Sequence, residues 1–187
     1  MTLQRVLPFT KSLLEQVVSQ GDQVIDATAG NGHDTLFLAH LTGADGKVFA
    51  FDIQKEAIEA TRSRVKEFNH VELVHDSHAK ISEYVDAPIS AAVFNLGYLP
   101  KGDHSIITKA QSTLSAMNQC LDLMQPGGLL LVVIYSGHDG GSEERDAVIE
   151  FVRMLPQTDF DVLQYGFINQ KHSPPFLVAV EKKRLKG

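Results

Sequence analysis

The sequence predicts an α/β protein with a mostly parallel seven-stranded sheet, helices on both faces and an antiparallel hairpin at the C-terminal end. Short apolar runs alternate with helical stretches along most of the chain, which is typical of parallel strands joined by crossover helices. Glycine and polar residues gather directly after several of the apolar runs. The last two apolar runs have no helical pattern between them, so they predict the hairpin at the sheet edge.

The elements follow in order. Strands are predicted at 24–27, 48–53, 71–74, 91–96, 129–135, 160–169 and 176–182. Helices are predicted at 10–20, 35–41, 55–68, 79–84, 106–124 and 142–155. The first helix has apolar residues along one face, at Leu13, Leu14, Val17 and Val18. The run 129–135 is apolar throughout, so both faces of that strand should be covered. The turn 126–128 (Pro-Gly-Gly) should stop the helix before it, and Ser142 is the expected N-cap of the last helix.

The composition predicts one globular domain over residues 1–187. The chain has 187 residues, of which 43% are hydrophobic and 21% charged, and these values exclude disorder as the main state. Cys120 is the single cysteine, which excludes an internal disulfide and suits a cytoplasmic protein. The run 129–135 is far shorter than the roughly 18 residues of a membrane span. Residues 1–5 lack the apolar segment of a signal peptide.

A glycine-rich turn is expected between the first strand and its helix. Residues 26–34 read Asp-Ala-Thr-Ala-Gly-Asn-Gly-His-Asp. Glycines let the backbone pass close to a ligand, and the helix start offers free N–H groups. Gly30 and Gly32 are spaced as in a dinucleotide-binding turn, but the third glycine is missing. Asp26 suits a ligand with an ammonium group rather than a pyrophosphate, and S-adenosylmethionine (SAM) is such a ligand. A plain tight turn remains the alternative.

Two further motifs follow the second and third strands. Asp52 lies where an acidic residue can bind both hydroxyls of a ribose, and Gln54 can reach the same ribose or an adenine. Asp52 could instead only cap the next helix. In the motif 75–78 (His-Asp-Ser-His), polar side chains including Ser77 and His78 can contact the exocyclic amine of an adenine, although Ser77 also suits a helix cap.

The fourth and fifth motifs follow the next two strands, where a doubly wound sheet places the reacting group. Residues 95–100 read Asn-Leu-Gly-Tyr-Leu-Pro. The Asn95 carbonyl can accept a hydrogen bond from an amine, and Tyr98 can pack on a planar ring. Residues 135–141 read Tyr-Ser-Gly-His-Asp-Gly-Gly, and His138 is a candidate proton acceptor or substrate contact. A plain strand end and a plain connecting loop are the respective alternatives.

The remaining patterns exclude other chemistry. The eight histidines are scattered without a metal-binding spacing, so we expect no metal. The nucleophile elbow of serine hydrolases is absent, and Cys120 in the middle of a predicted helix is expected to be a buried structural residue.

Taken together, these motifs resemble the YtqB-like family, whose members are also described as rRNA methylases. The residues that carry the resemblance are 26–35, 95–100 and 135–138 with Gly140, Gly141 and Glu144. Two features differ from related patterns. Leu96 and Gly97 replace the prolines of the Asn-Pro-Pro-Tyr box of amino-group methyltransferases, and Asp139 stands where YtqB-like proteins often have proline.

The resemblance implies a Rossmann-like class I fold and a SAM-dependent enzyme. The implied reaction converts 5-aminomethyl-2-thiouridine at tRNA wobble position 34 into 5-methylaminomethyl-2-thiouridine. The implied SAM contacts are Asn31, His33, Asp52, Gln54, Ser77 and His78. Asn95 and Tyr98 would lie near the amine, and His138 or water would take its proton. Because the leaving group of such a transfer is neutral, the task of the enzyme is mostly positioning.

Three alternatives stay open: a methyltransferase for rRNA or a small molecule, a noncatalytic SAM-binding module, and a dinucleotide oxidoreductase. The net charge of −6 argues against RNA binding by bulk charge, so an RNA footprint should be small. Few basic residues could contact phosphates, and they are Lys101, Lys109, Lys182, Lys183, Arg184 and Lys186. The C-terminal four could equally be a solvated tail. Methyltransferases of this small size often pair, so a homodimer is also open.

Overall fold

The computed structural model describes residues 2–86, 88–97, 109–135, 137 and 141–184. Seven strands form one sheet: β1 (Gln23–Asp26), β2 (Lys47–Phe51), β3 (Val71–Val74), β4 (Ile89–Leu96), β5 (Met124–Ile134), β6 (Phe160–Tyr165) and β7 (Phe176–Lys182). The helices are α1 (Val6–Val17), α2 (His33–Thr42), α3 (Lys55–Arg64), the 3-10 turn η1 (His78–Lys80), α4 (Ile81–Tyr84), α5 (Ala110–Leu123) and α6 (Gly141–Arg153).

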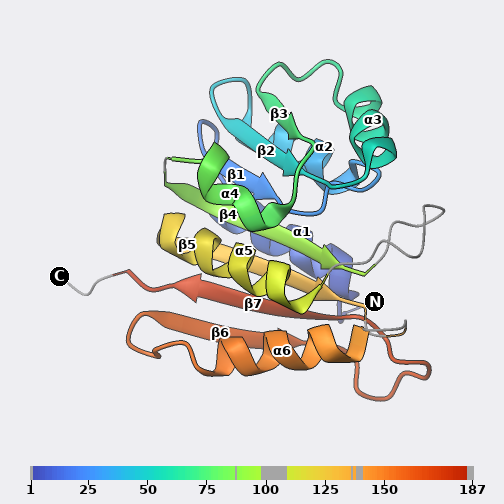
Figure 1. Cartoon of the computed structure of the whole chain (residues 1–187). Coiled ribbons are helices and arrows are strands. Elements are labelled where there is room, and N and C mark those ends of the chain that lie inside the picture. Colours follow the sequence, from blue (N-terminus) through green and yellow to red (C-terminus); the bar gives the residue numbers. More distant parts are fainter. Residues whose placement is uncertain (1, 87, 98–108, 136, 138–140, 185–187) are drawn as a thin grey trace.

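The strand order is β3-β2-β1-β4-β5-β7-β6, and β1 to β5 are all parallel. β7 lies antiparallel between β5 and β6, which confirms the predicted C-terminal hairpin. The carboxyl ends of the parallel strands therefore share one edge of the sheet, which we call the carboxyl edge (right in Figure 1). The chain direction across the sheet reverses between β1 and β4, and ligands bind at such a reversal in doubly wound folds.

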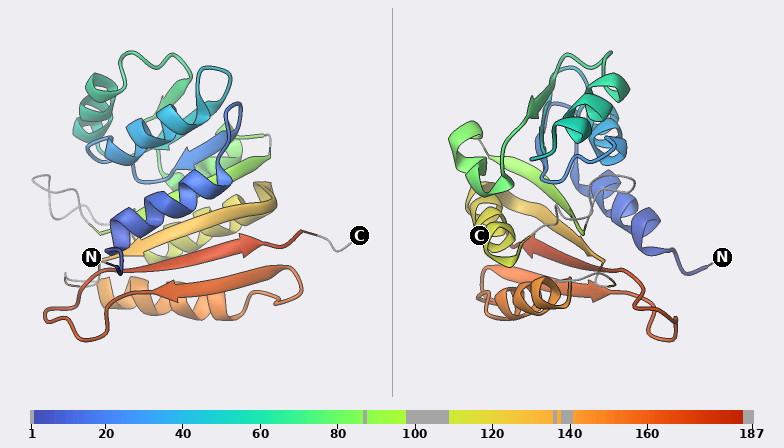
Figure 2. Two further views of the ribbon diagram at one scale, coloured as in Figure 1. Left: turned by 180° about the vertical axis from the view of Figure 1, so that it is seen from behind. Right: turned by 45° about the vertical axis from the view of Figure 1, so that its right-hand side comes forward.

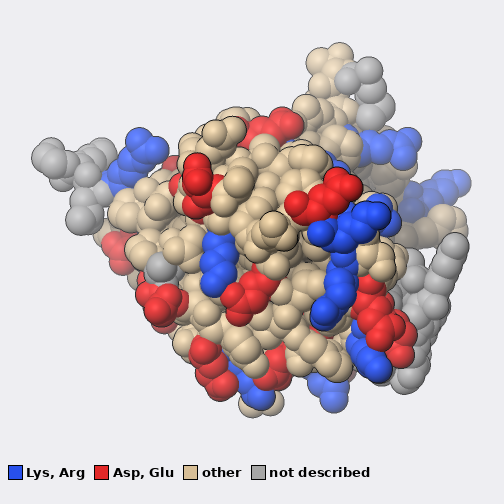
Figure 3. All heavy atoms as spheres, turned by 90° about the horizontal axis from the view of Figure 1, so that it is seen from above, with Lys and Arg blue, Asp and Glu red and all other residues tan. Residues whose placement is uncertain are grey.

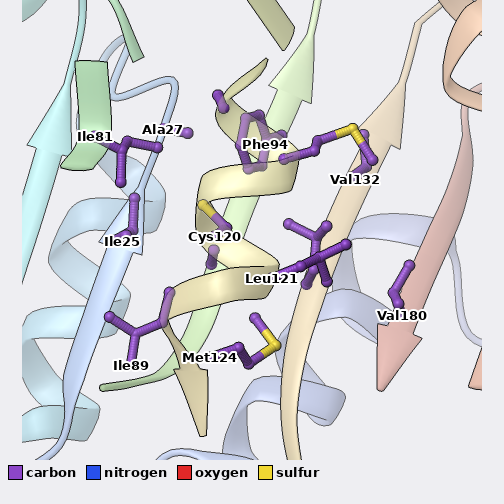
Figure 4. Close-up of a cluster of buried hydrophobic side chains, with 14 of the residues drawn as sticks. Ile25, Ala27, Ile81, Ile89, Phe94, Cys120, Leu121, Met124, Val132 and Val180 are labelled. Carbon is purple, nitrogen blue, oxygen red and sulfur yellow. The ribbon is translucent and has the colours of Figure 1, made fainter. Parts of the chain in front are cut away.

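Helices cover both faces of the sheet, as predicted (Figures 1 and 2). α1 and α2 pack on one face, where Leu14 and Leu38 contact a buried cluster of strand residues. α5 and α6 pack on the other face, where Cys120 is fully buried among Phe94, Val132 and other residues of the sheet (Figure 4). The expectation of a structural cysteine is confirmed, and burial raises the pKa of the thiol. Alternate residues of β5 belong to the two clusters, so both of its faces are covered.

Several element boundaries differ from the prediction. α1 begins at Val6, because Val6 is buried and Pro8 is tolerated in a first turn, and it ends before Val18, which has extended backbone angles. β6 ends at Tyr165, so residues 166–175 form a longer hairpin loop than expected. Ser142 lies inside the first turn of α6 rather than at its N-cap.

β5 begins at Met124, directly after α5, and runs through the Pro-Gly-Gly turn that was expected to precede it. Ile89 pairs with Met124, whereas Ala91 pairs with Leu129. The shift of register between these pairs accommodates residues 125–128 as an irregular stretch of strand. Within the described residues, no helix is long and apolar enough to cross a membrane.

Candidate active site

The glycine-rich turn is held in place by α3. Gly32 is the N-cap of α2 with a φ of 77°, and a Cβ atom there would lie 2.8 Å from the Cα of Thr61. The Thr61 hydroxyl donates a hydrogen bond to the Gly30 carbonyl at 3.2 Å, and Arg64 Nε donates to the Asn31 carbonyl at 2.7 Å. Only glycine satisfies both the left-handed backbone and the close contact at position 32. The turn is therefore a rigid element rather than a loose connection.

Asp52 joins this turn to the end of β2. Its Oδ2 accepts a hydrogen bond from the Gly30 N–H at 2.9 Å, and its Oδ1 accepts one from the Gln54 N–H at 2.9 Å. The carboxylate is half-buried, and each oxygen has a further lone pair. Gln54 itself is buried and precedes α3. Asp52 is thus fixed at the carboxyl edge with acceptor capacity left for a pair of hydroxyl groups.

Asp26 organises the turn from inside. The side chain is fully buried at the end of β1, where Oδ2 accepts from the Thr35 hydroxyl at 2.6 Å and Oδ1 accepts from the Thr28 N–H at 3.2 Å. Burial, and next the nearby Asp34 carboxylate, raise the pKa of Asp26 to about 7. The two hydrogen bonds of the Asp26 carboxyl group are to other residues of the protein. A direct contact of Asp26 with a ligand stays a prediction.

Asn95 is connected to the same turn twice. Its backbone N–H donates to the Thr28 hydroxyl at 2.7 Å, and its side-chain Nδ2 donates to Asp34 Oδ2 at 2.7 Å. Because Nδ2 faces Asp34, the amide has a defined orientation, and its Oδ1 is the atom that can accept a hydrogen bond from an amine. Asp34 was not among the predicted site residues, although it stands in the first motif.

The motif after β3 has mainly structural contacts. Ser77 accepts a hydrogen bond from the Ala79 N–H at 3.2 Å, so the expected capping role is confirmed. His78 is buried, its Nδ1 lies 2.9 Å from the Ala27 carbonyl, and its ring packs 5.6 Å from that of Phe94. Burial lowers the pKa of His78, which favours the neutral imidazole. His78 therefore links the end of β3 to the end of β1.

Asp76 fixes the residues that follow β3. It accepts hydrogen bonds from Lys80 Nζ at 3.0 Å, the Tyr84 hydroxyl at 2.9 Å and the Ser77 N–H at 2.7 Å. The hydrogen bond from Lys80 contributes most to a lowered pKa of Asp76. Through these hydrogen bonds, Asp76 holds η1 and α4 in place.

The structure brings the predicted residues Asp26, Asn31, Gly32, His33, Asp52, Gln54, Ser77, His78 and Asn95 to the carboxyl edge. His33 is exposed at the start of α2. Tyr98 and His138 lie outside the described residues, as do Lys101 and Lys186. A buried link between Thr113 and Glu144, at 2.6 Å, joins α5 to α6 and was not predicted.

The described C-terminal basic residues, Lys182, Lys183 and Arg184, lie at the edge opposite to this site. β7 is antiparallel, so Lys182 pairs with Phe160 at the edge opposite to Asn95. Lys182 Nζ donates to the Leu121 carbonyl, and Lys183 forms an ion pair with Asp161 at 2.9 Å. Lys182 and Lys183 therefore have partners within the protein, and a phosphate contact by the C-terminal basic residues stays a prediction.

The side chains around the glycine-rich turn fit SAM, the ligand that the sequence suggested. Asp34 and Asp52 flank the turn and would repel a pyrophosphate, whereas they suit a cation and the hydroxyls of a ribose. In the part of the chain that the structure describes, no three His, Cys, Asp or Glu side chains are grouped so that they could hold a metal ion. His75 and His78 contact different backbone carbonyls.

The strand order, the reversal at β1 and β4 and the rigid turn beside Asp52 define a Rossmann-like methyltransferase fold, as the sequence predicted. The family can be stated more narrowly. A family model described as "Putative rRNA methylase" matches residues 48–181, which is more than half of the chain. The chain belongs to this family, so the resemblance seen in the sequence is confirmed.

Known proteins agree with this assignment. The chain is 42% identical to the Arabidopsis thaliana protein named tRNA (mnm(5)s(2)U34)-methyltransferase, chloroplastic, over 90% of its own length and 66% of that relative. A structure from Clostridium thermocellum described as a "putative rRNA-methylase" shares 44% identity and a TM-score of 0.95, covering 97% of this chain and 100% of the other. SMU.1697c from Streptococcus mutans, described as "a putative methyltransferase" and solved in complex with SAH, shares 41% identity and a TM-score of 0.90, covering 97% of this chain and 99% of the other.

Proposed function

We propose that the chain is a SAM-dependent tRNA methyltransferase. It transfers a methyl group to the amine of 5-aminomethyl-(2-thio)uridine at wobble position 34 and gives 5-methylaminomethyl-(2-thio)uridine. The reaction type rests on the placement of Asp52 and Asn95 on the two sides of one rigid turn. The substrate rests on the name of the Arabidopsis relative, of which the chain spans 66%, and the cofactor on the SAH complex of the Streptococcus relative.

The contacts described above support the following placement of SAM at the carboxyl edge. SAM supplies an activated methyl group on a sulfonium centre. Asp52 would bind the ribose hydroxyls, with Gln54 beside it. The carboxylate of Asp34 would favour the cationic ligand electrostatically. The family resemblance adds Asn31, His33, Ser77 and His78 as contacts.

The acceptor half depends on Asn95. The amine must be neutral, and its lone pair must point at the methyl carbon. Asn95 Oδ1 would accept one N–H of the amine and so orient the lone pair, because Asp34 holds Nδ2 on the other side. The nitrogen forms the new N–C bond as the C–S bond breaks with its electrons remaining on sulfur. The surplus proton then leaves to a base, for which we propose His138 or water, and Tyr98 would pack against the uracil ring.

The pair Asp52→Ala and Asp45→Ala tests this function. Asp45 is an exposed carboxylate in the turn before β2, at the opposite edge, so its removal controls for the loss of one negative charge. Asp52→Ala should lose SAM affinity in calorimetry and methyl transfer from labelled SAM to tRNA that lacks the modification. Asp45→Ala should keep both. SAM binding without any transfer to tRNA by the natural chain would contradict the tRNA proposal, and equal SAM affinity of both variants would contradict the site.

We also propose a cytoplasmic location and leave a homodimer as a proposal. The single buried Cys120 suits a reducing compartment. Sedimentation of the purified chain decides between one and two copies. Microscopy of the tagged protein in its native cell tests the location.

A further inference from the structure

The carboxyl edge is divided by charge. The half made by β3, β2 and β1 carries Asp26, Asp34, Asp52 and Asp76, next to the proposed cofactor site. Seen from the β3 side, acidic and basic side chains are intermixed (Figure 3), and Lys47 pairs with Glu72 and Lys55 with Glu59. On the face that Figure 3 shows, basic side chains are therefore interspersed with acidic ones.

The other half combines two segments that are far apart in the sequence. Residues 2–11 lead into and form the start of α1, and residues 166–175 form the β6–β7 loop at the same edge (Figures 1 and 2). The Tyr165 hydroxyl donates to the Gln4 carbonyl at 2.7 Å, and the rings of Phe9 and Tyr165 lie 4.1 Å apart. These contacts fix the two segments side by side.

The charge of the two segments differs from that of the whole chain. Neither contains Asp or Glu, although the chain has a net charge of −6. They contribute Arg5, Lys11 and Lys171. Arg5 and Lys171 are exposed and form no ion pair within the described part of the chain. Lys11 Nζ lies 4.9 Å from the centre of the Phe37 ring. Glu143 at the start of α6 belongs to the opposite face of the sheet.

Aromatic side chains accompany these cations. Phe167 is partly exposed, and its ring lies 6.3 Å from that of Tyr165. Single-stranded RNA loops are bound by this combination of cations for phosphates and aromatic faces for bases. We propose that residues 2–11 and 166–175 form an RNA-docking surface, on which Arg5 and Lys171 contact phosphates of a single-stranded loop and Phe167 stacks on a base. That the loop is the tRNA anticodon loop rests on the proposed function.

Neutral substitutions test the surface directly. The double variant Arg5→Gln, Lys171→Gln removes two cations and keeps polar side chains of similar reach. Binding of a fluorescent anticodon-type RNA stem-loop is measured by anisotropy between roughly 50 and 200 mM salt. The dissociation constant should rise about tenfold, and the slope of log K against log salt should fall by roughly 0.7 for each cation removed. SAM affinity and the melting temperature should stay unchanged.

The matched control is Arg153→Gln, Arg184→Gln. Both residues are exposed and lie near the opposite edge, at the end of α6 and after β7. The control should bind the stem-loop like the natural chain. An equal loss of affinity in the control, or no loss in the Arg5, Lys171 variant, would overturn the surface.

Methyl transfer separates this proposal from the proposed function. If the function holds, the Arg5, Lys171 variant should have a raised KM for tRNA and an unchanged kcat. Binding of the stem-loop through Arg5 and Lys171 without any methyl transfer would support the docking surface and contradict the proposed function. Methylation of tRNA that does not depend on these residues would support the proposed function and contradict the docking surface. If the natural chain binds no RNA, both proposals are contradicted.

Discussion

At the scale of single residues, the pair Asp34 and Asn95 connects the cofactor half of the edge to the acceptor half. The two residues are 61 positions apart in the sequence, and their side chains meet at 2.7 Å. The amide of Asn95 could otherwise rotate and present Nδ2 to the amine, where its N–H would occupy the lone pair that must attack the methyl group. Asp34 is therefore a positioning residue for the proposed reaction.

Asp34→Ala and Asp34→Asn separate positioning from charge. Both variants lose the carboxylate charge, but the side-chain carbonyl of Asp34→Asn can still accept the hydrogen bond from Asn95 Nδ2. We expect kcat for methyl transfer, at saturating SAM, to be about fivefold lower in Asp34→Ala than in Asp34→Asn, since one oriented hydrogen bond contributes about 1 kcal/mol. Equal kcat values in the two variants would show that Asp34 acts through its charge alone.

Asp26 predicts a dependence of stability on pH. Its pKa is about 7 in the folded chain, chiefly because of burial, against an ordinary value of 3.8. Between these two pH values the folded state keeps a proton that the unfolded chain has released. The free energy of unfolding should therefore fall as pH rises through this window, and the loss should level off above pH 7.

The variant Asp26→Asn removes this titration. The difference in unfolding free energy between the natural chain and Asp26→Asn should change in favour of the variant from pH 4 to pH 7, by at most about 4 kcal/mol. Urea unfolding at a series of pH values measures it. Parallel pH profiles for the two proteins would contradict the raised pKa.

At the scale of elements, the turn before α2 depends on a backbone that only glycine allows. Gly32→Ala should destabilise the chain by more than the 1–2 kcal/mol or so of a left-handed alanine, because its Cβ would also meet Thr61 at 2.8 Å. It should also weaken SAM binding, since the turn would move relative to Asp52. Urea unfolding and calorimetry measure the two effects.

Gly21→Ala is the matched control for this substitution. Gly21 has a φ of 88° and no atom within 4 Å of an added Cβ, so alanine there has the backbone strain without the contact. It lies before β1, at the amino edge, and should leave SAM affinity unchanged. Equal destabilisation at both positions would mean that the contact with Thr61 is not a constraint.

The identity and order of the elements could be predicted from the sequence, because apolar runs and helical stretches alternate clearly. Their ends were less predictable, because tertiary contacts decide them. Pairing of Met124 with Ile89 draws β5 back through a Pro-Gly-Gly turn that locally reads as a break. Burial of Val6 likewise draws α1 four residues toward the N-terminus of the expected start.

The site was predictable in part for a related reason. The carboxyl ends of parallel strands meet at one edge, so Asp52, His78 and Asn95 could be placed together from the predicted parallel sheet. The hydrogen bonds that orient them could not be predicted, because Asp34, Thr28 and Thr61 find their partners only in the folded chain.

At the scale of the whole molecule, the antiparallel β7 decides which charges are near the site. It carries Lys182 to the opposite edge and returns the acid-free loop 166–175 to the carboxyl edge. A chain with a net charge of −6 can therefore present a local basic surface at the same edge as Asn95 while its cofactor half stays acidic. This arrangement is consistent with a small RNA footprint and no separate RNA-binding domain.

The central claim is that this molecule methylates an amine on the wobble uridine of tRNA. The most direct measurement is mass spectrometry of nucleosides from tRNA carrying 5-aminomethyl-2-thiouridine, after incubation with the purified chain and SAM. The account predicts that this nucleoside disappears and that 5-methylaminomethyl-2-thiouridine takes its place, with no change when Asp52→Ala is used. An unchanged nucleoside profile with the natural chain, or a methyl group on any other nucleoside, would contradict it.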